Sequence, residues 1–293
     1  MPPNQQVGID MTSRHRDPES GQRAFLRRVL AEGADRLGVT LTGDAVFGWH
    51  DRTIGSACLR EDHRLWLRAT AEHCDWAHGE GWTGNQDATA ITGVPKPVLI
   101  SRAEWEETPV LMYAELLTHV ADEPCSTSPE LTRPLVLPAS WWADLREAVD
   151  TLAAHSTPRG DHDPSRVPRD VEAFYGRTLD FPEPPIMRTE HTDLHWANLT
   201  QPRLWLLDWE YWGNAPAGYG AAVLYLHSLL VPATAAQVYD VFVDVLDTPT
   251  GRLAQLSAAA HILHRAEHSG DYPTLAGPVR TLADRLMMPA RRR

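Results

Sequence analysis

The chain has 293 residues, 43% of them apolar, and a formal net charge of -12. This length predicts two lobes rather than one small module, and the negative charge disfavours nucleic acid as the main partner, since a phosphate backbone is bound by clustered Lys and Arg. No apolar run approaches the roughly 18 residues that a membrane span needs, and the three cysteines are scattered, so we expect a cytoplasmic protein without membrane contact, disulfide framework or structural zinc.

The first half of the chain favours strands. Residues 1–17 are polar, and we expect a flexible N-terminal tail there. The stretch ESGQRAFLRRVLAEGADRLG predicts an amphipathic helix that ends near Gly38. LTGDAVFGWH, GSACLR and RLWLRATA are β-favouring stretches with turn signals between them, and they predict a three-stranded antiparallel start. KPVLIS and TPVLMYAELL predict two more strands.

From Pro138 onward, the apolar residues recur at helical spacing. Trp142, Leu145, Val149 and Leu152 lie three or four residues apart, which places them on one helical face. Two later sets have a similar spacing: Leu253, Leu256, Ala260 and Leu263, and then Leu275, Val279, Leu282 and Leu286. The sequence therefore predicts an α+β protein, with a strand-rich N-terminal lobe over residues 18–117 and a helical C-terminal lobe over 118–293.

One stretch of the helical part gathers polar groups beside apolar ones. In HTDLHWANL, Asp193 and Asn198 lie five residues apart, and Asp208 follows ten residues later at the end of the expected strand LWLL. A turn can bring the amide and the carboxylates together at that strand end. Such oxygen groups suit Mg²⁺, which completes its shell with waters and phosphates. A carboxylate beside the metal can accept a proton from an attacking hydroxyl, and this combination serves phosphoryl transfer.

The segments HTDLHWAN and LLDWE resemble the Brenner-type motif of the aminoglycoside phosphotransferase and choline kinase family. These proteins are small-molecule kinases with a bilobal protein-kinase-like fold, and the likeness would cover residues 40–285. The resemblance implies that Asp193 is the catalytic base, that Asn198 and Asp208 are the Mg²⁺ ligands, and that His191 braces the loop. Glu210 would order the site or touch substrate.

The same resemblance implies a cationic phosphate anchor on the third strand, where the family usually has lysine. Lys96, the only lysine, sits in the lead-in to a later strand, so Arg68 in LWLRA is the candidate. Arginine offers a planar fork rather than a point charge. The acidic partner of Arg68 should be Glu72, Glu80 or Asp87, and the sequence leaves that choice open.

Two further segments correspond to nucleotide contacts in the family. GWHDRTIGSA, residues 48–57, either arches over phosphates or forms an ordinary hairpin turn. PVLMYAELLTH resembles the linker strand that holds the adenine edge, in which Met112 would line the pocket and Glu115 to Leu117 would contribute main-chain groups. A plain core strand has the same sequence pattern.

Two readings of the histidines compete with this one. His191, Asp193 and His195 form an HxDxH pattern that could bind zinc, but this reading leaves Asn198 unexplained. His261, His264 and His268 share a helical face and are expected to be surface or half-buried residues. The tryptophans beside the motif and in the expected acceptor region favour core packing, with stacking on substrate as the alternative: Trp141, Trp142, Trp196, Trp209 and Trp212.

The sequence thus predicts an enzyme that transfers the γ-phosphoryl group of ATP or GTP, with Mg²⁺, to a hydroxyl group of a small molecule. Family analogy favours an antibiotic, aminoglycoside-like or nucleoside-like, and the negative net charge is compatible with a cationic substrate. A kinase of an ordinary metabolite such as a sugar, an amino alcohol or a choline-like compound is one alternative. A kinase-like binding protein without turnover is the other. We expect a monomer or a homodimer.

Overall fold

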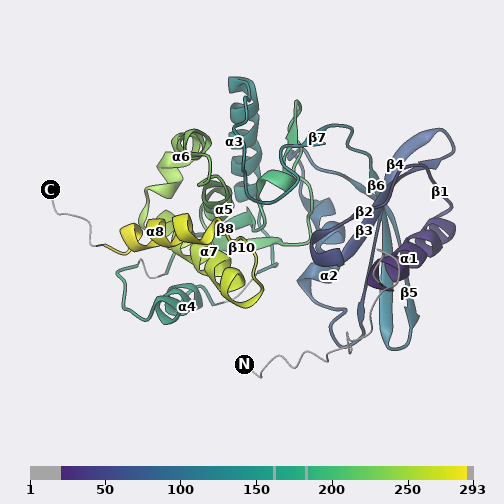
Figure 1. Cartoon of the computed structure of the whole chain (residues 1–293), viewed down its shortest axis with the longest axis horizontal. Coiled ribbons are helices and arrows are strands. Elements are labelled where there is room, and N and C mark those ends of the chain that lie inside the picture. Colours follow the sequence, from purple (N-terminus) through teal and green to yellow (C-terminus); the bar gives the residue numbers. More distant parts are fainter. Residues whose placement is uncertain (1–20, 161–162, 182–183, 289–293) are drawn as a thin grey trace. The chain divides into compact units, whose positions relative to one another are not determined.

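The computed structural model describes residues 21–160, 163–181 and 184–288 (Figure 1). Residues 1–17, where the sequence predicts a flexible tail, lie outside this part. The chain divides into two compact units. The first holds the described residues up to His73 together with Ser101–Leu116, and the second holds Cys74–Ile100 and the described residues from Leu117 onward. The segment 74–100, which lies within the N-terminal lobe predicted from the sequence, groups with the second unit.

Most of the sheet in the first unit comes from the stretches that the sequence marked as strands. The helices and strands of this region are α1 (Gly21–Leu37), β1 (Thr40–Leu41), β2 (Val46–Phe47), η1 (Trp49–Asp51), β3 (Thr53–Arg60), β4 (His63–His73), β5 (Leu99–Glu107) and β6 (Val110–Thr118). By the division into units, β5 begins and β6 ends in the second unit. The strand order is β1-β3-β4-β6-β5, and β2 pairs with β3. The pairs β1–β3, β2–β3 and β3–β4 are antiparallel. GWHDRT therefore connects two antiparallel strands as a hairpin.

Helix α1 packs on this sheet. Its residues Leu26 and Leu30 are buried in one apolar cluster with Leu67 of β4 and other strand residues. At Gly33 a Cβ atom would overlap the side chain of Ala114 on β6, so glycine permits the close approach of helix and sheet. Burial of this apolar surface is the main force that holds the unit together.

The second unit is mainly helical, as the sequence predicts. Its elements are α2 (Glu80–Asp87), η2 (Ala88–Ala90), β7 (Glu123–Pro124), α3 (Ala139–Ala154), α4 (Arg166–Tyr175), β8 (Met187–His191), η3 (Trp196–Asn198), β9 (Thr200–Gln201), β10 (Trp212–Pro216), α5 (Tyr219–His227), α6 (Pro232–Leu246), α7 (Pro249–His268) and α8 (Ala276–Leu286). Strand β8 pairs with β10 and β7 with β9, both antiparallel.

The buried face of α3 is rotated slightly from the predicted one. Leu145 and Leu152 are fully buried as predicted, but Trp141 rather than Trp142 completes the buried face. The ring of Trp141 stacks on Trp196 and its Nε1 donates a hydrogen bond to the Thr200 carbonyl. The periodicity alone could not distinguish the two adjacent tryptophans, because they precede Leu145 by four and three residues and both spacings fit a helical face.

The three cysteines, Cys58, Cys74 and Cys125, are all free. None of the helices in the described part of the chain is long and apolar enough to cross a membrane.

Candidate active site

Asp193 lies in the turn that follows β8. Its Oδ2 is 3.4 Å from Nε2 of His195, and Asn198 Nδ2 donates a hydrogen bond to the Asp193 backbone carbonyl at 2.9 Å. Burial by itself would raise the pKa of Asp193, but the neighbouring His195, with smaller contributions from His191 and His227, holds that pKa well below its usual value. Asp193 is therefore a carboxylate at neutral pH, able to accept a hydrogen bond from a hydroxyl group.

His191 ties this turn to the segment that carries Asp208. The imidazole is buried, and its Nε2 donates to the backbone carbonyl of Leu207 at 3.0 Å. Burial lowers the pKa of His191 to about 4, so the ring is neutral at pH 7. This hydrogen bond links the two segments, as a brace of the loop would. The other ring nitrogen, Nδ1, is buried without a hydrogen-bond partner among the described residues.

The segments that carry Asn198 and Asp208 are joined by backbone pairing. Leu199 forms an isolated antiparallel bridge with Leu206, and Leu207 N donates to the Asn198 carbonyl at 2.8 Å. The run LWLL thus forms one bridge rather than the strand that its apolar pattern predicts. Asp208 is exposed and adopts a left-handed backbone conformation, with a φ of 57°. This conformation is uncommon for residues with a side chain and often occurs at functional sites.

The donor groups of this loop suit magnesium. The Nδ2 of Asn198 is engaged by Asp193, so the amide oxygen is the side-chain atom left to accept from or bind another group. Hard oxygen ligands, few in number, are what Mg²⁺ takes from a protein when substrate phosphates supply the rest. Within the described ranges, no three His, Cys, Asp or Glu side chains cluster to hold a metal ion, so a site made by protein groups alone, as zinc prefers, is not formed there.

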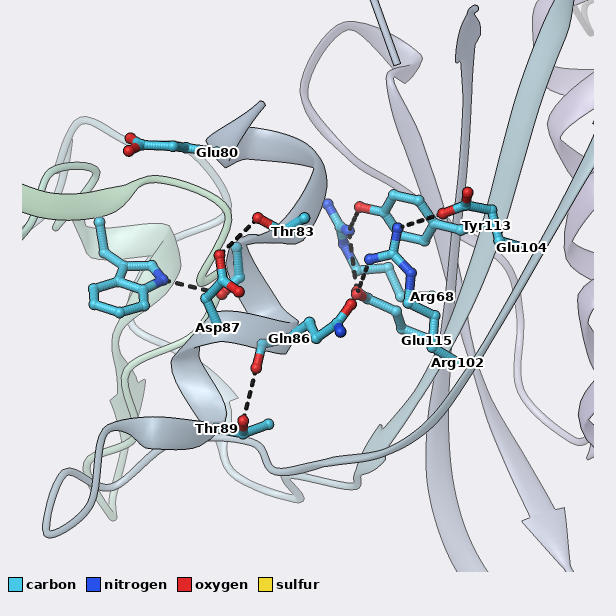
Figure 2. A network of polar contacts seen from close by, with 12 residues as sticks. Arg68, Glu80, Thr83, Gln86, Asp87, Thr89, Arg102, Glu104, Tyr113 and Glu115 are labelled. Atoms are coloured by element: carbon cyan, nitrogen blue, oxygen red, sulfur yellow. Dashed lines mark hydrogen bonds and ion pairs between the residues drawn. The ribbon is translucent and has the colours of Figure 1, made fainter. Parts of the chain in front are cut away.

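Arg68 belongs to a compact polar cluster within the first unit (Figure 2). Its Nη1 donates to Tyr113 Oη at 3.1 Å and lies 3.8 Å from the Glu115 carboxylate. Arg102 donates to the same carboxylate at 3.0 Å, and its guanidinium stacks over the Tyr113 ring at 3.9 Å. Glu115 is 1% exposed. The cluster therefore gives Arg68 an acidic partner from β6.

This partner differs from the three candidates named from the sequence, of which two lie on α2. Asp87 pairs with Arg159 at 2.6 Å, and Oε1 of Glu80 accepts a hydrogen bond from Gly160 N at 2.7 Å. For Glu115 the sequence predicts main-chain contacts with adenine, whereas its side chain is engaged in ion pairing with Arg68 and Arg102.

The other residues expected to line the adenine pocket are buried in their own units. Met112 is 1% exposed in the first unit, and Leu117 is 6% exposed in the second. Thr118 N donates to the Val98 carbonyl at 3.0 Å. The nucleotide roles of Met112, Glu115 and Leu117 remain predictions.

No protein-family model matches the chain, and no curated protein matches it. Solved structures do match. A thermostable mutant of aminoglycoside phosphotransferase APH(4)-Ia, in a ternary complex with ADP and hygromycin B, has a TM-score of 0.60 and 13% sequence identity, over 88% of this chain and 97% of that chain. The apo form has a TM-score of 0.59 at 14% identity, over 87% and 96%. A protein assigned as a fructosamine-3-kinase of Haemophilus somnus has a TM-score of 0.52 at 8% identity, over 90% and 100%.

The chain has the protein-kinase-like fold of these small-molecule kinases. The fold class predicted from the sequence is thereby confirmed, and so is the resemblance of the chain, at the level of fold, to the aminoglycoside phosphotransferase group.

In this kinase-like fold, Lys96 lies in the second unit, in the segment before β5. It is buried, and its Nζ lies 5.8 Å from the centre of the Trp209 ring, the residue after Asp208. Burial lowers the pKa of this ammonium group. Its place before β5 agrees with the lead-in position expected for it.

Glu190 is a buried acid of the kinase-like fold that the sequence analysis missed. It is 3% exposed, and its carboxylate accepts hydrogen bonds from Gly218 N at 2.7 Å and Gly220 N at 3.0 Å, at the N-terminus of α5. Burial raises the pKa of Glu190 to about 7, although these two N–H groups lower it. Glu190 links the strand that leads to Asp193 with α5. No local sequence signal distinguishes it from an exposed strand residue.

The three histidines of α7 lie at the surface, and Trp196 and Trp209 lie in the core. His261, His264 and His268 are exposed, as predicted for surface histidines. Trp196 and Trp209 are buried, and Trp196 Nε1 donates to Ser228 Oγ at 2.9 Å. Buried indoles with satisfied N–H groups are core residues, which favours the packing alternative for these two.

Proposed function

We propose that the protein is a Mg²⁺-dependent kinase that transfers the γ-phosphoryl group of ATP or GTP to a hydroxyl group of a small molecule. The observation that carries the proposal is that the turn with Asp193 and Asn198 is paired through its backbone with the segment that ends at Asp208, within the second unit. The likeness in fold to phosphotransferases supports it. A protein that only binds nucleotide has no need of a base and two metal ligands together.

The chemistry assigned to the loop is an in-line displacement. Asp193 accepts a hydrogen bond from the acceptor hydroxyl, whose oxygen attacks the γ-phosphorus. A new P–O bond forms, the bond to the bridging β,γ-oxygen breaks, and the hydroxyl proton passes to Asp193. Because the pKa of Asp193 is held low, its main contribution is to orient the hydroxyl. Asn198 and Asp208 would hold Mg²⁺, which when bound neutralises the phosphate charge.

Arg68 is the proposed phosphate anchor, and its fork is oriented by Tyr113 and Glu115. A guanidinium fixed by two partners offers its remaining N–H groups in a defined direction. Met112, Glu115 and Leu117 are the proposed adenine contacts, the last two through main-chain groups.

For the acceptor, we propose an antibiotic, aminoglycoside-like or nucleoside-like, and thus a resistance function in the cytoplasm. The structural match to a phosphotransferase held with ADP and hygromycin B supports this choice. A metabolite kinase is the second candidate, and the likeness to the protein assigned as a fructosamine-3-kinase favours it.

Thermal unfolding with nucleotide and metal tests the proposal. Ligand at about 100 times its dissociation constant should add roughly 2.7 kcal/mol of stability. The wild type should gain several degrees with Mg²⁺ and ATP or GTP together, and Asp208→Asn should lose the metal-dependent part. Asp284→Asn, an exposed carboxylate on α8, is the matched control. A wild type that neither nucleotide stabilises with any divalent metal would contradict the proposal. A nucleotide effect should lead to an acceptor screen by mass spectrometry.

A further inference from the structure

The turn after Asp208 needs support from outside itself. A left-handed backbone conformation in a residue with a side chain costs free energy and persists where surrounding contacts hold it. Asp208 has this conformation, with a φ of 57°. On the side of Asn198, Leu207 is fixed by hydrogen bonds at both its N–H and its carbonyl. The residues that follow, Trp209 to Trp212, must be held as well if the carboxylate is to keep its place.

Arg159 holds the carbonyl groups of that following segment. It is a buried arginine, 5% exposed, from the loop after α3. Its Nη2 donates to the Glu210 carbonyl at 3.1 Å, and its Nε donates to the Trp212 carbonyl at 3.2 Å. The guanidinium also lies over the Trp212 ring at 4.7 Å. Hydrogen bonds from a charged donor are stronger than neutral ones, so this group anchors the chain two and four residues after Asp208.

The same guanidinium reaches helix α2. Its Nη1 donates to Asp87 Oδ2 at 2.6 Å, and its Nη2 donates to the Glu80 carbonyl at 2.8 Å. Thr83 donates to the Asp87 carboxylate at 2.6 Å, and Figure 2 shows the two side chains meeting on α2. One planar cation therefore joins α2 to the turn, which a lysine could not do at so many points.

The backbone of α2 also touches the turn directly. Trp212 Nε1 donates to the Gly84 carbonyl at 3.0 Å. A Cβ atom at Gly84 would overlap the carbonyl oxygens of Trp209 and Glu210. Gly84 is thus a position where only the absence of a side chain allows the helix to approach so closely.

We propose that α2 and Arg159 form a clamp that sets the position of Asp208, and that Arg159 is a positioning residue for metal binding. This inference rests on the proposed function, because it takes Asp208 as a Mg²⁺ ligand. Partners that orient a metal ligand from behind typically affect metal affinity or activity 10–100-fold when removed. All residues of the clamp belong to the second unit. The proposal therefore does not depend on the Arg68 cluster of the first unit.

Calorimetric titration of the full chain with ADP, with and without Mg²⁺, tests the clamp in the absence of turnover. The variant is Arg159→Met, with Arg159→Lys as the conservative variant. The control is Arg146→Met, because Arg146 is likewise an ion-paired arginine of the second unit. It pairs with Asp150 and Asp244 and joins α3 to α6, and among the described residues it makes no contact with the turn. Mg²⁺ should strengthen ADP binding by the wild type and by the control.

Arg159→Met should bind ADP without Mg²⁺ as the wild type does and should lose about tenfold or more of the affinity gained with Mg²⁺. Arg159→Lys should recover part of it. A full Mg²⁺ effect in Arg159→Met would overturn the clamp while leaving the proposed function intact. A wild type without any Mg²⁺ effect would instead overturn the proposed metal site, and the clamp with it.

Should Arg159→Met fail to fold, as judged by circular dichroism, Asp87→Asn and Gly84→Ala replace it. Asp87 is 42% exposed, so the chain should fold without its charge, while the guanidinium of Arg159 loses the ion pair that ties it to α2. Each of these two variants should weaken the Mg²⁺ effect severalfold. A wild-type Mg²⁺ effect in both folded variants would overturn the clamp.

Discussion

The side-chain amide of Asn198 donates a 2.9 Å hydrogen bond to the backbone carbonyl of Asp193. One residue therefore fixes the turn that carries the proposed base and, in the proposed function, also supplies an oxygen ligand for Mg²⁺. The two roles are coupled, because a change in the amide group alters both the metal site and the direction of the Asp193 carboxylate.

Asn198→Asp should separate these roles. The new carboxylate keeps an oxygen ligand for Mg²⁺ but replaces the N–H donor with an acceptor that repels the Asp193 carbonyl. We expect Mg²⁺ dependence to persist, while kcat falls about 10²-fold because the hydroxyl is misoriented. Steady-state kinetics over a Mg²⁺ series measure both effects. Asn198→Ala, which removes ligand and donor together, should lose the Mg²⁺ dependence as well. Equal kinetic behaviour of the two variants would contradict the coupling.

Glu115→Gln should destabilise the first unit strongly. The Glu115 carboxylate, 1% exposed, is shared by Arg68 and Arg102, whose side chains are 11% and 13% exposed. Removing the charge takes the shared carboxylate away from two nearly buried guanidinium groups. Such a loss typically lowers the free energy of unfolding by about 3 kcal/mol or more. Urea denaturation measures this loss. Glu104→Gln is the control, since Glu104 also pairs with Arg102 but is 45% exposed, and it should cost less than about 1 kcal/mol. Similar losses in the two variants would contradict the assignment.

His227→Phe should flatten the acid side of the stability profile. Burial lowers the pKa of His227 to about 3, and its Nε2 has no hydrogen-bond partner among the described residues. Below about pH 6.5 the unfolded chain binds a proton at this residue, whereas the folded chain does not. The wild type therefore loses stability as the pH falls from 6.5 toward 3. The loss from this one group is about 1.4 kcal/mol per pH unit. Free energies of unfolding at pH 4.5 to 7 test this. An unchanged slope in the variant would refute the role of His227, since His191 contributes separately.

Glu190→Gln should change the dependence of the unfolding free energy on pH in the direction opposite to that expected for His227→Phe. The pKa of Glu190 is raised from 4.5 to about 7 in the folded protein, so the folded chain holds a proton that the unfolded chain has released. Stability from this group is present below pH 4.5 and is lost as pH rises toward 7. The variant, which cannot ionise, should lose less stability than the wild type between pH 5 and pH 7. A steeper loss in the variant would show that the carboxylate form is the favoured one at the N-terminus of α5.

The motif around Asp193 could be predicted because its geometry is local. Asp193 and Asn198 are five residues apart, and a single turn with one side-chain hydrogen bond brings them together. Asp208 needed only the short antiparallel return marked by the Leu199–Leu206 bridge. The predicted strand over LWLL was wrong in extent, because a fully apolar run shows burial but does not show how many residues find a pairing partner.

The partners of charged groups could not be predicted in the same way. Arg68 was expected to pair with an acid between residues 72 and 90, whereas the carboxylate beside it comes from Glu115 on β6. Asp87, one of the candidates, pairs with Arg159, which is 72 residues away along the chain. Nothing in the loop around Arg159 marks it as a residue that would be buried.

The sequence by itself determined which chemical groups this protein carries, the helical and strand periods that bury its apolar residues, and the short loop in which Asp193 and Asn198 meet. The tertiary structure decided which distant segments supply the partners: Glu115 for Arg68, Arg159 for the turn after Asp208, and the N-terminus of α5 for Glu190. The physical reason is that a buried charge must be paired or hydrogen-bonded. Which partner is within reach depends on how strands and helices far apart in the chain pack together, and local spacing carries no information about that.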